Sequence, residues 1–408
     1  MCFDCIKIFI YIDEVILIII MADEKLVPKL RFNYGDEWKI KKLMDVSIIN
    51  PKTNNLPPEF VYIDLESVEK GILTKINKIT IEDAPSRAQR LLDVGDILFQ
   101  TVRPYQMNNL YFDYDNDFYV ASTGYAQIKS KINSRFLYHY LHHAKFVDDV
   151  LKRCTGTSYP AINVSDLKKI KIRIPPDLNE QNLIGEFFDK IDKKIELLNK
   201  KYDNYVNFKK YLMQQIFAQK LRFNEDCIFE TKKVKNYLTE SKISGVDDIN
   251  KRLTVKLNLK GISIRDSKAT EIEGATKQFI RKSGQFIYGK QNLHKGAFGI
   301  IPKELDGYLT SSDIPSFDFN GEINPKWFYY YFSRQSFYEN LERLSTGTGS
   351  KRIAPKDFLN IKINVPEIKE QDKTANLLEN VDEKIEDISN ELFQINKFKK
   401  GLLQQMFI

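Results

Sequence analysis

The sequence of 408 residues predicts an α+β fold, in which two mixed α/β domains are separated by a pair of long antiparallel coiled-coil helices. Three observations support this prediction. An apolar seam with helical spacing occurs twice, around Ile195 and, 190 residues later, around Ile385. The segments before the two seams repeat each other, and both contain short strand-like runs. The repeat is too long for a solenoid, so it indicates an internal pseudo-two-fold duplication.

The composition is that of a globular protein with real cores, with 42% hydrophobic and 29% charged residues. The formal net charge of 62 − 55 = +7 is a weak indication of a polyanionic partner. The four cysteines, Cys2, Cys5, Cys154 and Cys227, do not form a disulfide framework, which suits a reducing cytoplasm. Cys2 and Cys5 make a lone C-x-x-C, and without a second pair this spacing does not predict a zinc site.

Residues 1–20 are apolar but are interrupted by Asp4, Asp13 and Glu14. The uninterrupted part is too short to span a bilayer, and it lacks the basic region and cleavage site of a signal peptide. A polar stretch opens at Met21. We therefore expect residues 1–20 to be a non-native, over-extended leader with Met21 as the biological start. The alternative is a membrane-associating tail.

The first block of the repeat combines strand-like runs with a helical pattern. Residues 134–152 predict one amphipathic helix capped by Ser134, with His139, His142 and His143 clustered on it. A metal site is one interpretation of these histidines, and packing is the favoured one because no acidic or cysteine ligand has suitable spacing. The strand-like runs are residues 38–47, 60–66, 96–102, 119–129 and 169–176.

The long helices are predicted at residues 180–219 and at the equivalent positions 190 residues later. Both seams carry a lysine in the same slot, Lys209 and Lys399. A parallel pair would set these like charges against each other at a buried position. An antiparallel pair lets each lysine reach an acid such as Asp382 or Asp192. Separate solvent-facing helices and a homodimer are the alternatives. The central seam residues are Ile191, Ile195, Leu198 and Tyr202 in the first helix, and Val381, Ile385, Ile388 and Leu392 in the second.

The sequence lacks the motifs of methyl-transferring and nucleotide-binding enzymes. It has no Asp/Asn/Ser-Pro-Pro-Tyr/Phe motif and no Phe-x-Gly-x-Gly loop for a methyl donor. Residues 284–290 satisfy G-x4-G-K, but Gln291 replaces the Ser or Thr of a phosphate-binding loop, and the stretch aligns with a strand of the first block. The sequence therefore indicates binding rather than catalysis.

Three sets of loop residues are candidates for contacts with bases and phosphates, because Arg, Gln and Asn suit base edges and Lys suits phosphates. Small hydroxyl residues beside glycine can hold an anion. For each set the alternative is a solvated loop or a structural turn. After the strand that begins at Gly95 the candidates are Gln100, Thr101, Arg103, Tyr105, Gln106, Asn108 and Asn109. The equivalent loop of the second block has Lys290, Gln291, Asn292, His294 and Lys295. The third set is Thr155, Thr157, Ser158 and Tyr159, with Thr346, Thr348, Ser350, Lys351 and Arg352 as its second copy.

One duplicated pattern resembles a known family. Thr155-Gly-Thr-Ser-Tyr-Pro-Ala-Ile-Asn163 is followed by Asp166-Leu167, by Pro175-Pro176 and by Glu180-Gln181 at the start of the long helix. The second copy keeps Thr346-Gly347, Asp357, Pro366 and Glu370-Gln371, but has Ile353-Ala354-Pro355 in place of Ala-Ile-Asn. This pattern is similar to that of the specificity subunit of type I restriction–modification systems.

The resemblance implies a non-catalytic, cytoplasmic DNA-binding protein with two target-recognition domains, each reading half of a bipartite asymmetric double-stranded DNA site. The helices would set the spacer and dock two methyltransferase subunits, alongside restriction/translocase subunits. Methyl donor, ATP and Mg would belong to those partners, with no cofactor, metal or membrane for this chain. The domains would be residues 21–178 and 220–368, with helices at 179–219 and 369–408. A coiled-coil adaptor and a methyltransferase-fused, type II-like system are the alternatives.

Overall fold

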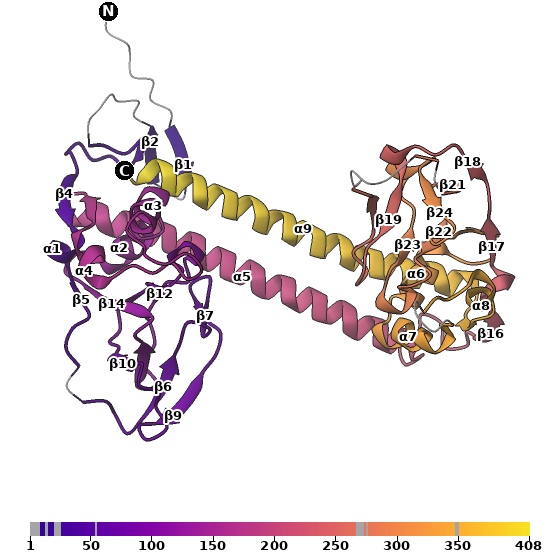
Figure 1. Ribbon diagram of the computed structural model, residues 1–408, viewed down its shortest axis with the longest axis horizontal. Helices are drawn as coiled ribbons and strands as arrows, with labels where there is room; N and C mark the ends of the chain where they lie inside the picture. The colour runs from indigo at the N-terminus through magenta and orange to yellow at the C-terminus, as the bar shows by residue number, and fades with distance from the viewer. Residues whose placement is uncertain are drawn as a thin grey trace, which may run out of the picture. The chain divides into compact units, whose positions relative to one another are not determined.

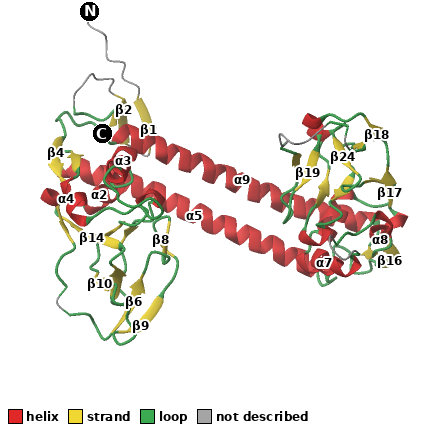
Figure 2. Ribbon diagram, in the orientation of Figure 1, coloured by secondary structure: helices red, strands yellow, loops and turns green. Residues whose placement is uncertain are grey.

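The computed structural model describes residues 26–53, 55–266, 273–274, 276–346 and 351–408, and the backbone alone of residues 9–12 and 15–19 (Figure 1). The chain divides into two compact units. The first unit is Met1–Asn199 with Asn390–Ile408, and the second is Lys200–Ser389. Helices and strands contribute to both units (Figure 2). No helix of the described part of the chain is long and apolar enough to cross a membrane.

Two long helices are the repeated frame, α5 (Leu178–Phe217) and α9 (Ile368–Met406). Each helix contributes one half to each unit, because the unit boundaries fall within both helices. In the first unit the beginning of α5 shares a core with the end of α9, and in the second unit the end of α5 shares a core with the beginning of α9. The predicted antiparallel pairing is therefore confirmed. All eight central seam residues are buried or half-buried.

The two seam lysines explain why the pairing is antiparallel. In the second unit, Lys209 Nζ lies 2.5 Å from Asp382 Oδ1, and the hydroxyl of Tyr330 donates to the other carboxylate oxygen at 2.8 Å. In the first unit, Lys399 forms an ion pair with Asp192. Each half-buried cation thus has a carboxylate within its own unit, which lowers the cost of taking its charge out of water.

The first unit contains two four-stranded sheets. One has the order β12-β11-β14-β5 and is antiparallel, and the other has the order β10-β13-β6-β9, in which β13 and β6 are parallel. The chain enters and leaves the unit through a ribbon of β4 and β15. The strands are β1 (Phe9–Ile12), β2 (Val15–Ile19), β3 (Leu30–Arg31), β4 (Lys39–Lys42), β5 (Ser47–Ile49), β6 (Glu59–Ile63), β7 (Val68–Glu69), β8 (Ile72–Leu73), β9 (Asn77–Thr80), β10 (Ala88–Leu91), β11 (Ile97–Gln100), β12 (Leu110–Tyr111), β13 (Tyr119–Ser122), β14 (Tyr125–Ser130) and β15 (Lys171–Ile174). The helices before α5 are α1 (Leu43–Val46), η1 (Pro104–Gln106), α2 (Ser134–Tyr140), α3 (Ala144–Leu151) and α4 (Val164–Lys169).

The single helix predicted at residues 134–152 is wrong, because α2 and α3 are separate helices. Their cap also differs from the prediction. Asn133, not Ser134, caps α2, and its side-chain oxygen accepts the backbone N–H of Phe136 at 2.7 Å. The break lies at His143, whose backbone is extended (φ −67°, ψ 134°). Its ring packs against Phe407, with 6.1 Å between the ring centroids, so the turn aims His143 at the end of α9.

The second unit repeats this plan and diverges in its second sheet. The order β17-β25-β22-β23 matches the first antiparallel sheet, and the ribbon of β16 and β26 matches that of β4 and β15. The counterpart of the other four-stranded sheet has the order β18-β21-β24, with three strands among the described residues, and β19 and β20 form a separate pair. The strands are β16 (Glu230–Lys233), β17 (Leu238–Ser241), β18 (Ser244–Gly245), β19 (Leu253–Val255), β20 (Ile262–Ile264), β21 (Gln278–Ile280), β22 (Phe286–Tyr288), β23 (Phe298–Ile300), β24 (Leu309–Ser311), β25 (Ser316–Phe319) and β26 (Lys362–Val365). The helices are η2 (Val234–Asn236), η3 (Ile249–Lys251), η4 (Leu293–Lys295), η5 (Lys303–Leu305), α6 (Pro325–Phe332), α7 (Gln335–Asn340), η6 (Leu341–Leu344) and α8 (Pro355–Leu359).

A glutamine at the start of each long helix ties the helix to its unit. Gln181 donates from Nε2 to the carbonyl of Pro175 at 2.9 Å and accepts the backbone N–H of Asn133 at 3.1 Å. In the second unit Gln371 makes the same two bonds to Pro366 and Asn324, at 2.9 and 2.8 Å. One side chain thus links the last strand, the long helix and the cap of α2 or α6. The Glu-Gln pair of the sequence pattern therefore has a structural role in both copies.

The end of each long helix completes the core of a unit. Phe407 is 1% exposed and lies against the rings of Trp38, Phe136, Tyr140 and Phe188. Its equivalent in the second unit, Phe217, contacts Trp327 and Tyr331, and the guanidinium of Arg334 lies 4.8 Å from its ring centroid. Both phenylalanines are at the same position of the repeat. The last turn of each helix is therefore part of a hydrophobic core.

Replacing Phe407 by alanine tests this packing. We expect Phe407→Ala to destabilise the first unit by about 3–5 kcal/mol, because it leaves a cavity among aromatic rings. Phe398→Ala is the matched control, since Phe398 is on the same helix but is 50% exposed, and it should cost within about 0.5 kcal/mol. Hydrogen–deuterium exchange of the complete chain would measure both. Protection should fall in β11, β14 and α2 only for Phe407→Ala, and equal losses in the two variants would contradict this packing.

Candidate nucleic-acid interface

In the first unit, two of the predicted loops meet. The loop after β11 and the loop at residues 155–161 are joined by backbone bonds, from the N–H of Arg103 to the carbonyl of Pro160 at 2.7 Å and from the N–H of Ile162 to the carbonyl of Thr101 at 3.0 Å. The guanidinium of Arg103 lies over the ring of Tyr159, 4.2 Å from its centroid. Two candidate segments that are more than 50 residues apart in sequence therefore form one surface, which we call the first loop pair.

The predicted residues of the first loop pair divide by exposure. Tyr105 and Tyr159 are 48% and 64% exposed. Arg103 and Asn108 are half-buried, and Gln106, Thr155, Thr157 and Ser158 are exposed. In contrast, Gln100, Thr101 and Asn109 are buried. The half-buried arginine and the exposed glutamine and hydroxyl groups are accessible to a ligand, whereas the buried members act within the loop.

The three buried members shape the loop by hydrogen bonding. Asn109 accepts the backbone N–H of Gln100 at 2.9 Å. The Gln100 side chain donates to the amide oxygen of Gln106 at 2.8 Å and accepts the backbone N–H of Asn108 at 3.2 Å. Thr101 donates its hydroxyl to the carbonyl of Gly124 at 2.8 Å. Buried polar groups held in this way are costly to remove, because each loss leaves a partner unsatisfied.

A half-buried histidine in the turn between α2 and α3 supports the same loop. His142 Nδ1 lies 2.8 Å from the carbonyl of Tyr138, which fixes Nδ1 as the protonated nitrogen. Nε2 then faces the Asn109 amide nitrogen at 3.4 Å as an acceptor. Burial lowers the pKa of His142 to about 4, so the ring is neutral at physiological pH. By sequence His142 belongs to a cluster of three histidines, and only the fold shows that it contacts the loop.

The backbone of the first loop pair is held in an uncommon conformation at two residues. Arg103 has φ +53° and Met107 has φ +52°, and both flank the short helix η1. A non-glycine residue in this left-handed region costs of the order of 1 kcal/mol. Such strain persists only where the surroundings impose it, and it clusters at functional sites. The Arg103 N–H bond to Pro160 and the ring of Tyr159 are the surroundings here.

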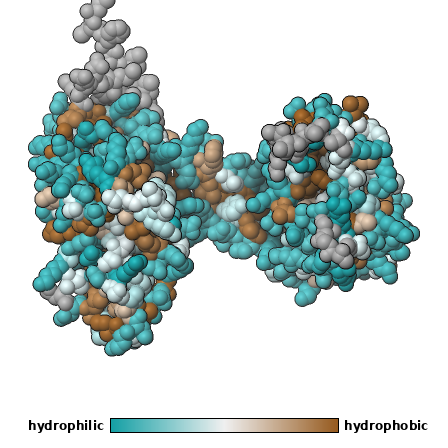
Figure 3. Space-filling model, viewed as in Figure 1, coloured by the Kyte–Doolittle hydropathy of each residue, from teal (hydrophilic) through white to brown (hydrophobic). Residues whose placement is uncertain are grey.

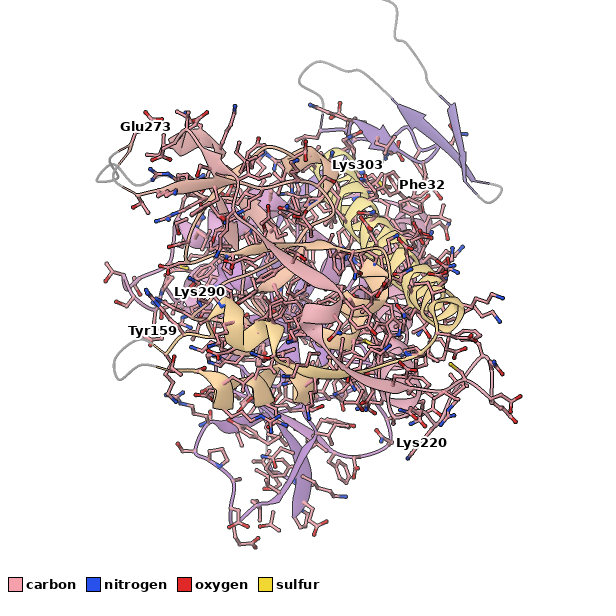
Figure 4. All side chains as sticks on the ribbon, turned by 90° about the vertical axis from the view of Figure 1, so that its right-hand side faces the viewer. Phe32, Tyr159, Lys220, Glu273, Lys290 and Lys303 are labelled. Carbon is pink, nitrogen blue, oxygen red and sulfur yellow. The ribbon has the colours of Figure 1, made fainter. Side chains whose placement is uncertain are left out.

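The second unit builds the same crossing with other side chains. The N–H of Lys290 donates to the carbonyl of Asp313 at 3.0 Å, and the N–H of Ile353 donates to the carbonyl of Lys290 at 2.9 Å. These bonds correspond to those of Thr101 with Gly124 and Ile162. We call the joined segments 289–295 and 346–353 the second loop pair. Thr348 and Ser350 lie outside the described residues. Tyr159 and Lys290 are labelled in Figure 4, each within its own unit.

The second loop pair has a different charge pattern. Gln291, Lys295, Thr346, Lys351 and Arg352 are exposed, and Lys290, Asn292 and His294 are half-buried. Arg352 lies 3.4 Å from the carboxylate of Asp313, which stands where the first unit has Gly124. Lys351 pairs with Glu342 at 3.0 Å. Desolvation lowers the pKa of His294, which favours its neutral form. The two loop pairs thus share a backbone and offer different chemistry.

Other candidate sites have structural explanations. Residues 284–290 form strand β22 and a turn, and the following helix η4 has three residues, so the order of a phosphate-binding loop is absent. His139 is buried with Nε2 2.8 Å from Asp189, and burial lowers its pKa. Among the residues that the structure describes, no three His, Cys, Asp or Glu side chains are grouped to hold a metal ion.

The comparison with protein families gives a duplicated match. Residues 35–204 and 219–397 both match the type I restriction modification DNA specificity domain, and together they span more than half of the chain. The type I restriction enzyme MjaVIII specificity subunit of Methanocaldococcus jannaschii is 24% identical over 416 residues, which cover 90% of this chain and 91% of the relative. The HindI specificity subunit of Haemophilus influenzae is 28% identical over 169 residues, covering 40% of this chain and 36% of the relative.

Two solved structures have the same fold. The crystal structure of a type I restriction–modification S subunit from M. genitalium has a TM-score of 0.62 at 14% identity, covering 94% of this chain and 99% of that chain. A chain from a study of assembly and conformational transition of the type I system has a TM-score of 0.54 at 15% identity, with coverages of 92% and 98%. At these identities the likeness concerns the fold, whereas the duplicated family match concerns the sequence. The chain therefore belongs to the family of type I restriction–modification specificity subunits, the non-catalytic components that carry the DNA specificity of these enzymes.

Proposed function

We propose that each unit reads one half of a bipartite, asymmetric double-stranded DNA site. The observation that supports this most is the repeated loop pair, in which equal backbone bonds hold different side chains. A duplicated frame with unlike loops is what two readers of unlike sequences need. Base edges in the major groove are distinguished by hydrogen-bonding side chains, and phosphates fix the position of the protein.

The exposed and half-buried residues of each loop pair would supply these contacts. In the first unit Arg103 and Gln106 suit base edges, while Thr155, Thr157 and Ser158 suit phosphate oxygens. In the second unit the exposed Gln291 and the half-buried Asn292 would read bases, and the other groups would contact the DNA backbone. The neighbours of these residues hold the loops in place. The other proposed contacts of the second unit are Lys290, His294, Lys295, Thr346, Thr348, Ser350, Lys351 and Arg352, and the first unit adds Tyr105, Asn108 and Tyr159.

The long helices would set the spacer between the half-sites and dock the partners. An unbroken helix of 40 residues is about 60 Å long at 1.5 Å per residue. Phe208 and Phe398 occupy the same repeat position on the two helices and are 48% and 50% exposed. Apolar residues are visible on the long helices among hydrophilic ones (Figure 3). Two equivalent exposed rings fit two copies of one partner, which we take to be the methyltransferase subunits.

The remaining assignments follow from this role. Restriction/translocase subunits complete the cytoplasmic complex, and the methyl donor, ATP and Mg are bound by partner chains. We take residues 21–178 and 220–368 as the recognition domains, with helices at 179–219 and 369–408. Translation from Met21 stays a prediction.

Sequencing of methylation in cells with this chain and its cognate methyltransferase tests the proposal, because it should give one two-part motif with a fixed spacer. An undivided motif, or DNA-independent partner binding alone, would refute it.

Removing Arg103 should relax one half-site only. We expect Arg103→Ala to lower discrimination in the half read by the first unit by about 1–3 kcal/mol, the value of one bidentate base contact. Gln291→Ala should relax only the other half. Methylation sequencing of each variant measures both effects. Simultaneous relaxation of both halves in either variant would show that the units are not independent readers.

The stacking of Arg103 on Tyr159 provides a control for that experiment. Tyr159→Phe keeps the ring and should keep the motif, whereas Tyr159→Leu removes about 0.5–1 kcal/mol of cation–π interaction and should weaken the same half-site as Arg103→Ala. Arg222→Ala removes an exposed arginine whose guanidinium donates to the carbonyl of Gln219, outside the loop pairs. It should leave both halves unchanged.

Binding should depend steeply on salt. Each phosphate neutralised by Lys or Arg contributes about −0.9 to the slope of log K against log salt, through release of counterions. Fluorescence anisotropy of the complex with its duplex, from 50 to 200 mM salt, measures the slope. A flat dependence would favour the coiled-coil adaptor over a DNA reader.

Lengthening both helices should lengthen the spacer. Four residues inserted after Asn199 and after Asn390 add about 6 Å to each helix, and one base pair rises about 3.4 Å. The four residues overshoot a turn by about 40°, close to the rotation of one base pair at 10–10.5 per turn, so we expect a spacer longer by one pair. The half-site sequences should stay the same. An active variant with the original spacer would contradict the role of the helices as a ruler.

A further inference from the structure

The loop pairs continue into a third segment, the start of β10 in the first unit. The backbone N–H of Thr123 donates to the carbonyl of Arg87 at 2.9 Å. The next residue, Gly124, accepts the N–H of Thr101 at 3.0 Å, and Thr101 accepts the N–H of Ile162 at 3.0 Å. Main-chain bonds therefore run without a gap from Arg87, across the turn after β13, into the first loop pair.

The side chain of Arg87 is placed toward solvent. Its neighbour Ala88 is buried, at 5% exposed, and pairs with Ser122 in the sheet. Successive side chains of a strand point to opposite faces, so Arg87 points away from the core, and it is exposed. Among the residues that the structure describes, Arg87 forms no ion pair and no side-chain hydrogen bond. Its charge is therefore available to a ligand.

The second unit has a basic residue at the same place. Gln278 pairs with Ser311 as Ala88 pairs with Ser122, and Gln278 is likewise buried, at 4% exposed. The residue before it, Lys277, is exposed. Asp313, two residues after Ser311, accepts the N–H of Lys290 and so connects the turn after β24 to the second loop pair. A cation thus precedes the strand in both units, although their second sheets differ.

The distance from Arg87 to the first loop pair indicates which groups of a bound duplex these cations would contact. Bonded strands lie about 4.8 Å apart and successive Cα atoms about 3.8 Å apart, so the path from Arg87 through Thr123 and Gly124 keeps its backbone within roughly 14 Å of that of Thr101. The major groove is about 12 Å wide and about 8.5 Å deep. A loop pair whose side chains reach base edges in the groove would therefore hold Arg87 beside the phosphates that border it.

We propose that the starts of β10 and β21 are a further part of the DNA interface, with Arg87 and Lys277 contacting phosphates that flank the two half-sites. This inference rests on the proposed DNA-reading function. These residues carry no base preference, because a phosphate is the same at every position. They would position each unit on the duplex while the loop pairs select the sequence.

The test is the salt dependence of single-charge variants, measured with the full chain and its methyltransferase subunits on the duplex found by methylation sequencing. Arg87→Gln should make the slope shallower by about 0.9, which corresponds to about eightfold weaker binding at 0.1 M salt relative to a 1 M reference. Lys277→Gln should do the same, and Arg87→Lys should keep the original slope. The methylated motif should be unchanged in all three.

Lys169→Gln is the matched control, because it removes one exposed charge from the end of α4, where Lys169 lies 3.5 Å from Asp166. It should leave the slope unchanged. An unchanged slope in Arg87→Gln, an equal loss in Lys169→Gln, or an altered half-site in Arg87→Gln would each overturn the inference. If the unaltered complex shows no steep, specific binding, the proposed function itself fails and this inference falls with it.

Discussion

The burial of a helix-end phenylalanine in an aromatic core is the interaction on which the rest of the fold depends. Phe407, at the end of α9, closes a core whose other members include Trp38 and Phe136. The first unit can therefore not complete its core until residue 407 has been synthesised. Phe217, at the end of α5, is half-buried and packs against the core of the second unit. Packing of both helix ends determines which halves of the two seams pair within each unit. It also places Lys399 beside Asp192, with which it forms an ion pair.

The loop pairs show how one frame can present two different sets of side chains. The bonds that cross each loop pair join main-chain atoms, so they do not depend on the side chains at those positions. Thr101 and Lys290 occupy equivalent places in this crossing, one a buried neutral residue and one a half-buried cation. Substitutions there change what the loop offers without changing where it lies. A backbone-bonded scaffold is thus suited to diverge in recognition while its geometry is kept.

Periodicity and duplication made the frame predictable. Whether a loop residue is exposed or buried depends on partners elsewhere in the fold. The seam spacing and the slot shared by Lys209 and Lys399 were sufficient for the antiparallel pair. Asn109 is a polar loop residue by sequence, yet it is buried because His142 and Gln100 bind it. The break between α2 and α3 was missed because no Gly or Pro marks it, and the apolar pattern continues through the turn.

The junction between helix and unit shows how far the two copies have drifted while keeping one constraint. A buried carboxylate at a helix start is favoured by the helix dipole, but it needs hydrogen-bond donors. Glu180 accepts two bonds from the guanidinium of Arg31, at 2.6 and 2.8 Å, and both side chains are buried. Glu370 accepts the backbone N–H of Phe223 at 2.8 Å. Arg31 and Phe223 belong to a segment, KLRFN, that occurs in both copies at residues 29–33 and 220–224. This segment thus satisfies the carboxylate with a side chain in one unit and with its backbone in the other. The requirement that persists is a fixed attachment of helix to unit, and under the proposed function this attachment would transmit the length of the helices to the positions of the loop pairs.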